Sequence, residues 1–236
     1  MTDYTRLSPD EKERLIQKAK DVGFQTETDH GNCIQSCLNG IYQAFPDIGL
    51  TEDMLQACFG IAGGCGCSLM GTCGALNAAA WVISLFYGRP IHDLDGDYDR
   101  CHELVREVVE QFQREYDGIL CREVMVHNMG GVYDWKTPEG DAAYMEHDGT
   151  FHCATAVAFC AGIIGRMIVD ADADAPEFRH DVGRSSAAGG AAGKEHGPYG
   201  RVDRHGAAAD PVRRVLPDLP VAQTLAAVMV HNMGGV

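Results

Sequence analysis

The segment Gly60–Gly88, GIAGGCGCSLMGTCGALNAAAWVISLFYG, constrains the fold of this chain more than any other stretch. Its first half is rich in glycine and carries Cys65, Cys67 and Cys73, and its second half is almost uniformly apolar. Glycine permits unusual φ values and close backbone approach, and a continuous apolar run is typical of a buried helix. The segment therefore predicts a loop that brings thiols to the N-terminus of a buried helix over residues 73–87.

Helical periodicity and helix-end signals recur on both sides of this segment. Ser8-Pro9-Asp10-Glu11 combines a capping box with proline at the first helical position, which predicts a helix start. We expect helices from Pro9 to the mid-twenties, over 33–45, from Thr51 to Cys58, over 73–87, over 101–116, from about 119, and over 152–169, with a helical turn after Pro138. Strand-like alternation is hard to find, so the chain predicts an all-α fold, a compact bundle of about six helices with a glycine-rich cysteine loop.

The composition changes near residue 170. Residues 1–170 hold all ten cysteines and are expected to form one helical, cysteine-rich redox domain. Residues 171–236 are rich in Ala, Gly, Arg, Asp and Pro and predict a low-complexity, disordered tail. The tail ends in Val228–Val236, a letter-for-letter copy of Val124–Val132 whose flanks share nothing with the original, which indicates a recent duplication or an artefact of gene assembly.

Charge and hydropathy exclude several classes of function. The 236-residue chain has a formal net charge of −15, whereas nucleic-acid binding needs a basic surface. The N-terminus lacks the basic and apolar regions of a signal peptide, and no apolar run reaches the roughly 18 residues of a membrane span. We therefore expect a cytoplasmic protein with no nucleic-acid or membrane role, and a Gly/Ala-rich helix over 73–87 that would suit a homodimer interface as well as a core.

Ten cysteines without an export signal argue against a disulfide framework, because reducing compartments keep thiols free. Any single cysteine is as readily explained as a small buried apolar side chain. Ten cysteines, several of them beside glycines, indicate metal ligands or redox groups instead.

Four cysteines, Cys33, Cys73, Cys121 and Cys153, fall at or near the predicted first turns of separate helices. A helix N-terminus favours the thiolate over the thiol, and the thiolate is the form that attacks disulfides and binds soft metals. If these helix starts meet at one end of a bundle, four thiolates can converge on an iron–sulfur cluster or zinc. Further possible ligands are Cys37, Cys58, Cys65 and Cys67.

The residues resemble the redox-active protein family named for its C…GCAxxG…C…C cysteine pattern. The resemblance covers about residues 7–170 and runs through LSPDEKERLIQKAKDVGF, GNCIQSCLNGIYQAF, the Gly60–Gly88 segment, GILCREV, VYDW and FHCATAVAFCAGI. It implies cysteine-based redox activity, with the four family cysteines on Cys33, Cys73, Cys121 and Cys153. The motif's final glycine is missing, because the segment continues from Cys73 as GALNA. Some relatives carry haem, but this chain has no C-x-x-C-H attachment motif, so we expect no haem c.

Three functions remain open from the sequence. The first is an anaerobic-type cytoplasmic redox protein that holds an iron–sulfur cluster on the four cysteines and transfers electrons to a redox partner protein. The second is a thiol–disulfide oxidoreductase or sensor in which Cys73 is the reactive thiolate and Cys65 or Cys67 resolves the mixed disulfide. The third is a structural or adaptor module stapled by zinc.

Overall fold

The computed structural model describes residues 2–171, and the predicted tail with its repeated nonapeptide lies outside the described residues. Within residues 2–171 the chain forms eight α-helices, two short 3₁₀ helices and no strand, so the all-α prediction is confirmed. The helices are η1 (Tyr4–Arg6), α1 (Pro9–His30), α2 (Cys33–Ala44), α3 (Glu52–Ala57), η2 (Phe59–Ile61), α4 (Gly74–Tyr87), α5 (Asp99–Tyr116), α6 (Cys121–Met129), α7 (Pro138–Glu146) and α8 (Gly149–Val169).

The predicted helix starts are largely confirmed by the capping contacts. Ser8 forms a capping box with Glu11, whose carboxylate accepts from the Ser8 backbone N–H at 3.0 Å. Thr51 caps α3, and Thr137 caps α7 just before Pro138. α1 is longer than predicted and continues to His30, because the chain leaves the helix only at Gly31, where φ is +72°.

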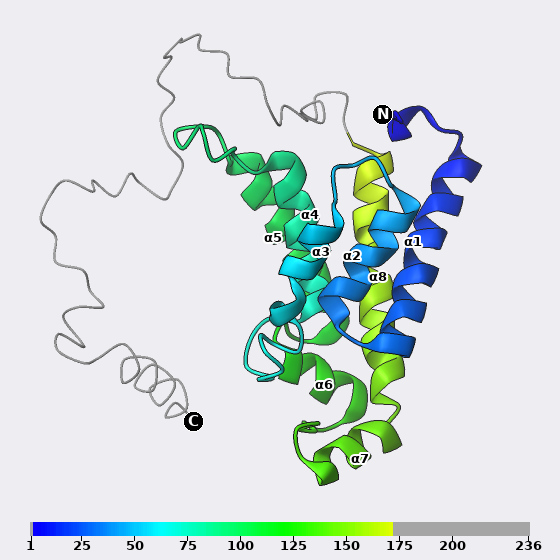
Figure 1. Ribbon diagram of the computed structural model, residues 1–236, viewed down its shortest axis with the longest axis vertical. Coiled ribbons are helices and arrows are strands. Elements are labelled where there is room, and N and C mark those ends of the chain that lie inside the picture. Colours follow the sequence, from blue (N-terminus) through cyan, green and yellow to red (C-terminus); the bar gives the residue numbers. More distant parts are fainter. Residues whose placement is uncertain (1, 172–236) are drawn as a thin grey trace, which may run out of the picture. The chain divides into compact units, whose positions relative to one another are not determined.

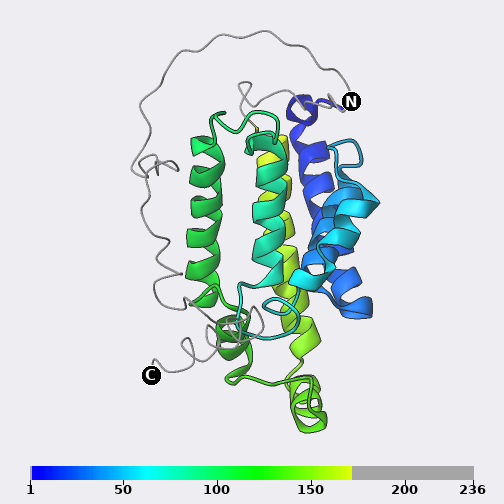
Figure 2. The ribbon, with the colours of Figure 1, turned by 60° about the vertical axis from the view of Figure 1, so that its left-hand side comes forward.

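α8 is the central helix of the bundle. It packs against α1, α2 and α4, and α5 lies against α4 (Figures 1 and 2). α8 is long and apolar enough by composition to cross a membrane, but half of that span is buried inside the protein, as in a core helix. The buried residues of α1, α2, α4, α5 and α8 form one continuous hydrophobic core, which we call the large core.

α1 and α2 approach closely because small residues face each other between them. A Cβ added at Gly40 of α2 would collide with the Ala19 carbonyl of α1 and lie 3.0 Å from the Gly23 nitrogen. One turn after Gly23, the same face of α1 carries Glu27, which is therefore held deep between the helices.

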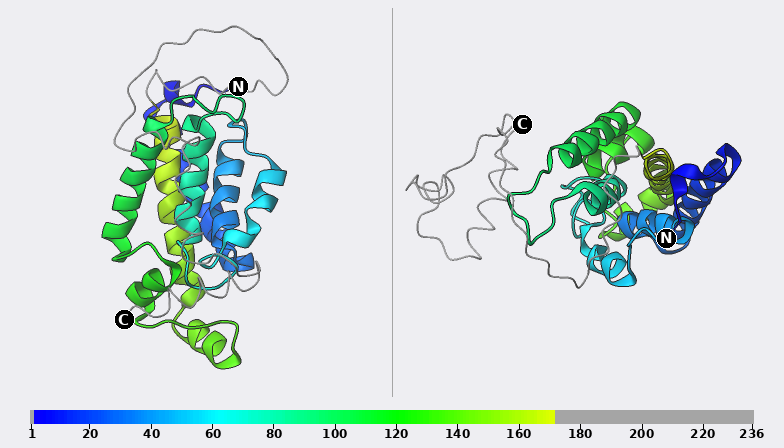
Figure 3. Two further views of the ribbon diagram at one scale, coloured as in Figure 1. Left: turned by 90° about the vertical axis from the view of Figure 1, so that its left-hand side faces the viewer. Right: turned by 90° about the horizontal axis from the view of Figure 1, so that it is seen from above.

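The glycine-rich loop, α6 and α7 lie together at one end of the bundle, at the lower end of Figure 1 and of Figure 3, left. A second, separate hydrophobic cluster forms there, which we call the small cluster; its buried residues are Leu69, Cys121, Met125 and Met129, with Tyr133, Trp135 and Tyr144 packed against them. The candidate site lies where the large core meets this small cluster.

Candidate thiol centre

Cys33 is the first residue of α2, and four hydrogen-bond donors act on its sulfur. The Cys73 thiol donates to it, and so do the backbone N–H groups of Gly63, Gly74 and Ile34. Ile34 and Gly74 belong to the first turns of α2 and α4, so two helix N-termini face one sulfur. The sulfur lies so close to Gly74 that a Cβ at this position would collide with it.

These donors give Cys33 and Cys73 very different pKa values. The hydrogen bond from Cys73, followed by the three backbone N–H groups, overcomes burial and lowers the pKa of Cys33 to about 6. The pKa of Cys73 is raised well above its usual range, first because its proton is held by Cys33 and then by burial and the neighbouring sulfur charges. At neutral pH the pair therefore consists of a Cys33 thiolate and a Cys73 thiol, which share one proton.

The glycine loop covers this pair in a left-handed conformation. Five consecutive residues, Gly63–Cys67, have positive φ between 55° and 70°. Three of the five are glycine, but Cys65 and Cys67 carry side chains, and positive φ costs such residues about 1–2 kcal/mol each. The turn is closed by hydrogen bonds from Leu69 N–H to the Gly63 carbonyl and from Gly71 N–H to the Gly64 carbonyl, both 2.9 Å. The sequence predicted a glycine loop here, and the structure shows that the loop also donates the Gly63 N–H to Cys33.

Backbone hydrogen bonds join the loop to the start of α6. Cys73 N–H donates to the Ile119 carbonyl at 2.8 Å, and Cys121 N–H donates to the Gly71 carbonyl at 2.9 Å. Thr72 and Leu120 form an isolated antiparallel bridge between them. Cys73 and Cys121, distant in the sequence, are thereby brought to the same end of the bundle.

Cys153 lies one turn inside α8. α8 begins at Gly149, three residues earlier than predicted, so Cys153 is the fifth residue of the helix and not at its start. The Tyr144 hydroxyl of α7 donates to its sulfur at 3.3 Å. Burial and the Cys33 charge raise the pKa of Cys153 despite this hydrogen bond, and burial, followed by the Cys33 charge, raises that of Cys121 to about 12.

The four predicted helix-start cysteines therefore gather near one another, with charge interactions from Cys33 reaching Cys73, Cys121 and Cys153. All ten cysteines are free thiols. In the part of the chain that the structure describes, however, no three His, Cys, Asp or Glu side chains are arranged to hold a metal ion. The four-cysteine metal or cluster site stays a prediction.

The remaining predicted cysteines divide into deep and peripheral ones. Cys37 and Cys58 are fully buried, and burial is the first cause that raises the pKa of each. Cys65 is exposed and Cys67 half-buried. The Cys67 sulfur lies beside Gly63, and its charge acts on Cys121. The sulfur that hydrogen-bonds Cys73 is that of Cys33. The sequence predicted Cys65 or Cys67 as the resolving thiol for Cys73, but no such hydrogen bond joins either of them to Cys73.

Glu27 is the residue of this site that sequence reasoning missed. It is only 5% exposed, and burial, followed by the charge of Cys33, raises its pKa to about 8 against a hydrogen bond with Ser36. Its helical spacing gave a signal, because Glu27 follows Ile16, Ala19 and Gly23 along the buried face of α1. A carboxyl group on an otherwise apolar helix face is the sequence signal that could have identified Glu27.

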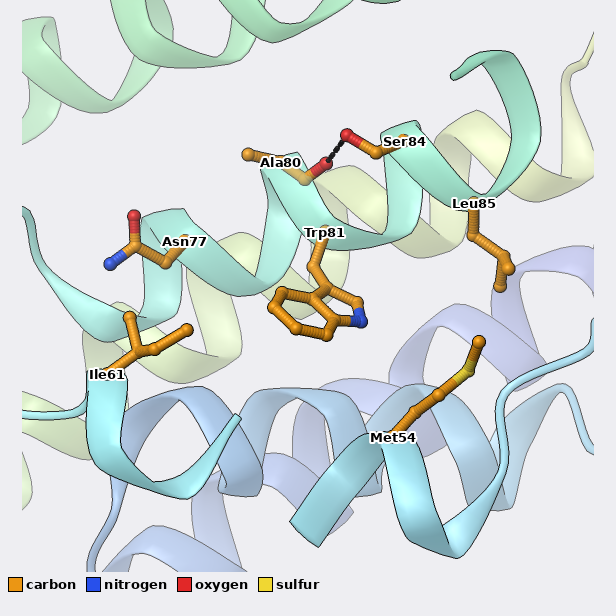
Figure 4. Close-up of a pocket in the computed structure, with 7 residues that line it drawn as sticks. All are labelled: Met54, Ile61, Asn77, Ala80, Trp81, Ser84 and Leu85. Carbon is orange, nitrogen blue, oxygen red and sulfur yellow. Dashed lines mark hydrogen bonds between the residues drawn. The ribbon is translucent and has the colours of Figure 1, made fainter. Parts of the chain in front are cut away.

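An open apolar groove of about 540 Å³ lies beside the centre, between α3, η2 and α4. Trp81 of α4 projects into it between Ile61 and Met54 (Figure 4). Asn77 lines the groove one turn after Cys73, and its backbone N–H donates to the Cys73 carbonyl at 3.0 Å. No cysteine lines the groove, so the thiol centre lies outside it.

Comparison with known proteins identifies one family. The model of the family described as "Putative redox-active protein (C_GCAxxG_C_C)" matches residues 31–167, more than half of the chain. This range contains all ten cysteines, including the Cys33–Cys73 pair. No curated protein and no solved structure was found to match the chain.

Proposed function

The chain belongs to the C_GCAxxG_C_C family of redox-active proteins, and we propose that it is a thiol–disulfide redox protein whose reactive pair is Cys33 and Cys73. The observation that carries the proposal is the hydrogen bond from the Cys73 thiol to the Cys33 sulfur. A dithiol that shares one proton holds a nucleophile and a second thiol in contact, which is what disulfide exchange requires.

The exchange proceeds in two steps. The Cys33 thiolate attacks one sulfur of a partner disulfide, so that a mixed disulfide forms and one partner thiolate leaves and takes a proton from water. The Cys73 sulfur then attacks Cys33, the mixed disulfide breaks, and the second partner sulfur leaves with the Cys73 proton. The partner gains two electrons and two protons, and the protein is left with a Cys33–Cys73 disulfide.

The acidities favour Cys33 as the attacking group. A thiol with a pKa near ambient pH combines a high thiolate fraction with good nucleophilicity. Cys33, with a pKa of about 6, meets this condition, whereas the raised pKa of Cys73 suits the second, resolving step. The thiol–disulfide alternative predicted from the sequence has Cys73 as the thiolate and Cys65 or Cys67 as the resolving thiol, whereas the hydrogen bonds support Cys33 as the thiolate and Cys73 as the resolving thiol.

The surroundings suit a protein partner in a reducing compartment. Cys33 is half-buried, so a partner disulfide must dock against the protein to reach it. Ten free thiols are stable where glutathione and thioredoxin-type systems keep cysteines reduced, which supports the cytoplasm. We propose a disulfide-bearing redox partner protein as the substrate.

Anaerobic purification followed by iron, zinc, sulfide and thiol analysis tests the proposal. We expect metal-free protein in which mild oxidation removes two thiols and dithiothreitol restores them, and in which peptide mapping links Cys33 to Cys73. Cys33→Ser should abolish this change, and Cys101→Ser, which alters a buried cysteine of α5 outside the pair, should not.

Two other results would contradict the proposal. Stoichiometric iron and sulfide with broad visible absorption, lost in Cys33→Ser, Cys121→Ser and Cys153→Ser alike, would establish the iron–sulfur cluster predicted from the sequence. Colourless protein with bound zinc and no reversible thiol loss would establish the zinc-stapled module.

A further inference from the structure

Glu27 is a buried carboxyl group that takes no part in the two steps of the proposed disulfide exchange. It is only 5% exposed, and within residues 2–171 its Oε2 has no hydrogen-bond partner. A buried and unpartnered carboxylate is costly, since desolvation of a charge is repaid only by good partners. Burial therefore opposes the ionisation of Glu27, and a second negative charge in the same buried region opposes it further.

The groups that face Glu27 come from every element around it. Cys33 and Cys37 belong to α2, Cys153 to α8, Cys121 to α6 and Tyr144 to α7, and each interacts electrostatically with Glu27. All of them are acids, and no basic side chain contributes to the pKa of Glu27. The Cys33 thiolate and the Glu27 carboxylate are therefore like charges in one buried region, and no basic side chain among residues 2–171 offsets the charge of Glu27.

Ser36 can hydrogen-bond Glu27 in both protonation states, and as a donor to the carboxylate it lowers the pKa of Glu27. Its hydroxyl hydrogen-bonds the Glu27 carboxyl group, and it also donates to the Gly31 carbonyl at 2.8 Å. A hydroxyl has one hydrogen but two acceptor lone pairs. While Ser36 donates to Gly31 it can only accept from Glu27, which needs a proton on the carboxyl group. Rotation of the hydroxyl towards Glu27 would serve the ionised form.

We infer that Glu27 is the proton-holding residue of the Cys33–Cys73 pair: it carries a proton while Cys33 is a thiolate and releases it when the two cysteines form their disulfide. The inference rests on the proposed function. Formation of the disulfide removes the thiolate charge, and with it the repulsion that opposed ionisation of Glu27. The buried region then carries one negative charge in both redox states, on Cys33 when reduced and on Glu27 when oxidised.

The proton and electron balance follows from this. Reduction of the disulfide by an external dithiol delivers two electrons, and two protons enter, one to Cys73 and one to Glu27, while Cys33 remains a thiolate. Without a titrating group at position 27, only the Cys73 proton enters. The pKa values of Cys33 and Glu27 are about 6 and about 8. The number of protons taken up on reduction between these pH values therefore reports on Glu27.

The test is the pH dependence of the reduction equilibrium in dithiothreitol redox buffers, with the full chain. Each proton taken up changes the equilibrium constant about tenfold per pH unit, or about 30 mV for a two-electron couple. Dithiothreitol itself releases two protons when it is oxidised at these pH values. Its exchange constant with the native protein should therefore be almost independent of pH, whereas the exchange constant with Glu27→Gln should change about tenfold per pH unit. Glu27→Asp should retain the native slope, and so should Glu13→Gln, the same chemical change on the exposed face of α1.

Infrared difference spectroscopy gives a second readout that does not depend on the slope. Reduction should produce a protonated-carboxyl band in the native protein, and Glu27→Gln should lack it. A two-electron couple whose slope and infrared difference are the same in Glu27→Gln and the native protein would overturn the role of Glu27. Absence of any reversible couple in the native protein would instead overturn the proposed function, so the two failures are distinguishable.

Discussion

The large core and the small cluster hold the two sides of the thiol centre by different means. In the large core, glycines let α1, α2 and α8 approach closely, and regular helices position Glu27 on α1 and Cys33 at the start of α2. In the small cluster, six side chains from the loop, α6 and α7 and their connections pack with Cys121. The positions of Cys33 and Cys73 follow from the large core, whereas the backbone covering them belongs to the loop.

This contrast accounts for how the Cys33 thiolate can be stabilised and, in the proposed exchange, also reached by a partner disulfide. Helix N-termini held rigidly by the large core donate to Cys33 at Ile34 and Gly74. The third backbone donor, Gly63, lies in a left-handed turn whose residues carry conformational strain. We expect a partner disulfide to approach from the loop side, because the small cluster buries less apolar surface and opens at lower free energy.

The strongest effect should come from the charge buried in the large core. The folded-state pKa of Glu27 is raised from 4.5 to about 8, so its protonated form stabilises the fold below pH 4.5 and this stability is lost as pH rises towards 8. Glu27→Gln has no carboxyl group to ionise, so its free energy of unfolding should not fall with this titration. Between pH 4 and pH 8 the stability of the variant should therefore rise relative to the native protein by on the order of 4 kcal/mol. Urea unfolding of the reduced proteins at the two pH values measures this. Equal pH dependence in both would contradict a buried titrating carboxyl group.

A smaller effect is expected where α1 and α2 touch. Gly40→Ala would push a methyl group into the Ala19 carbonyl, which is backbone and cannot rotate away. We expect a loss of about 3 kcal/mol in the free energy of unfolding, at the upper end of overpacking costs. Gly162→Ala on α8 is the matched control, since its nearest neighbour is the Lys20 side chain at 3.3 Å. Similar losses in both would show that the helices are not closely fitted.

In the small cluster, two glycines of the same turn separate strain from contact. Gly64 and Gly66 have φ of +70° and +59°, but a Cβ at Gly64 would lie 2.9 Å from the Cys121 Cβ, whereas Gly66 has open space around it. Gly66→Ala should cost about 1 kcal/mol from φ alone. Gly64→Ala should cost about 1 kcal/mol more and should change the alkylation rate of Cys121, measured by mass spectrometry. Identical behaviour of the two variants would mean that the loop does not press on Cys121.

The weakest effect is expected at Tyr144. Tyr144→Phe removes the hydrogen bond to Cys153 and should cost about 1 kcal/mol. Because that hydrogen bond lowers the pKa of Cys153, its thiolate should form at still higher pH in the variant. Thiolate absorbance during pH titration, with a Cys153→Ala background as control, detects the change. An unchanged titration would contradict the hydrogen bond from Tyr144 of α7 to the Cys153 sulfur.

Much of this arrangement could be predicted from the sequence. Capping residues and helical spacing located most helices, since Ser8, Thr51 and Pro138 act locally. The gathering of Cys33, Cys73, Cys121 and Cys153 followed from their positions at or near helix starts. The C-terminal repeat falls outside the described residues, so the predicted tail is not tested.

What could not be predicted depends on contacts between distant segments. The acidity order of Cys33 and Cys73 follows from which sulfur receives the N–H groups of Gly63 and Gly74, and both cysteines begin helices in the sequence. Cys65 and Cys67 are close to Cys73 in the sequence, but the sulfur that hydrogen-bonds Cys73 is that of Cys33, which comes from α2. Helix-end position alone is therefore too coarse to assign the nucleophile.

Alkylation of Cys33 as a function of pH, followed by mass spectrometry of its peptide, tests the proton-sharing pair without any partner protein. We predict that the rate rises with a midpoint near pH 6, that Cys73→Ala moves the midpoint upward by removing the S–H donor, and that Cys73→Ser, which keeps a donor, moves it less. A Cys33 midpoint near the ordinary thiol value in the native protein, unaltered by Cys73→Ala, would contradict the proton-sharing pair.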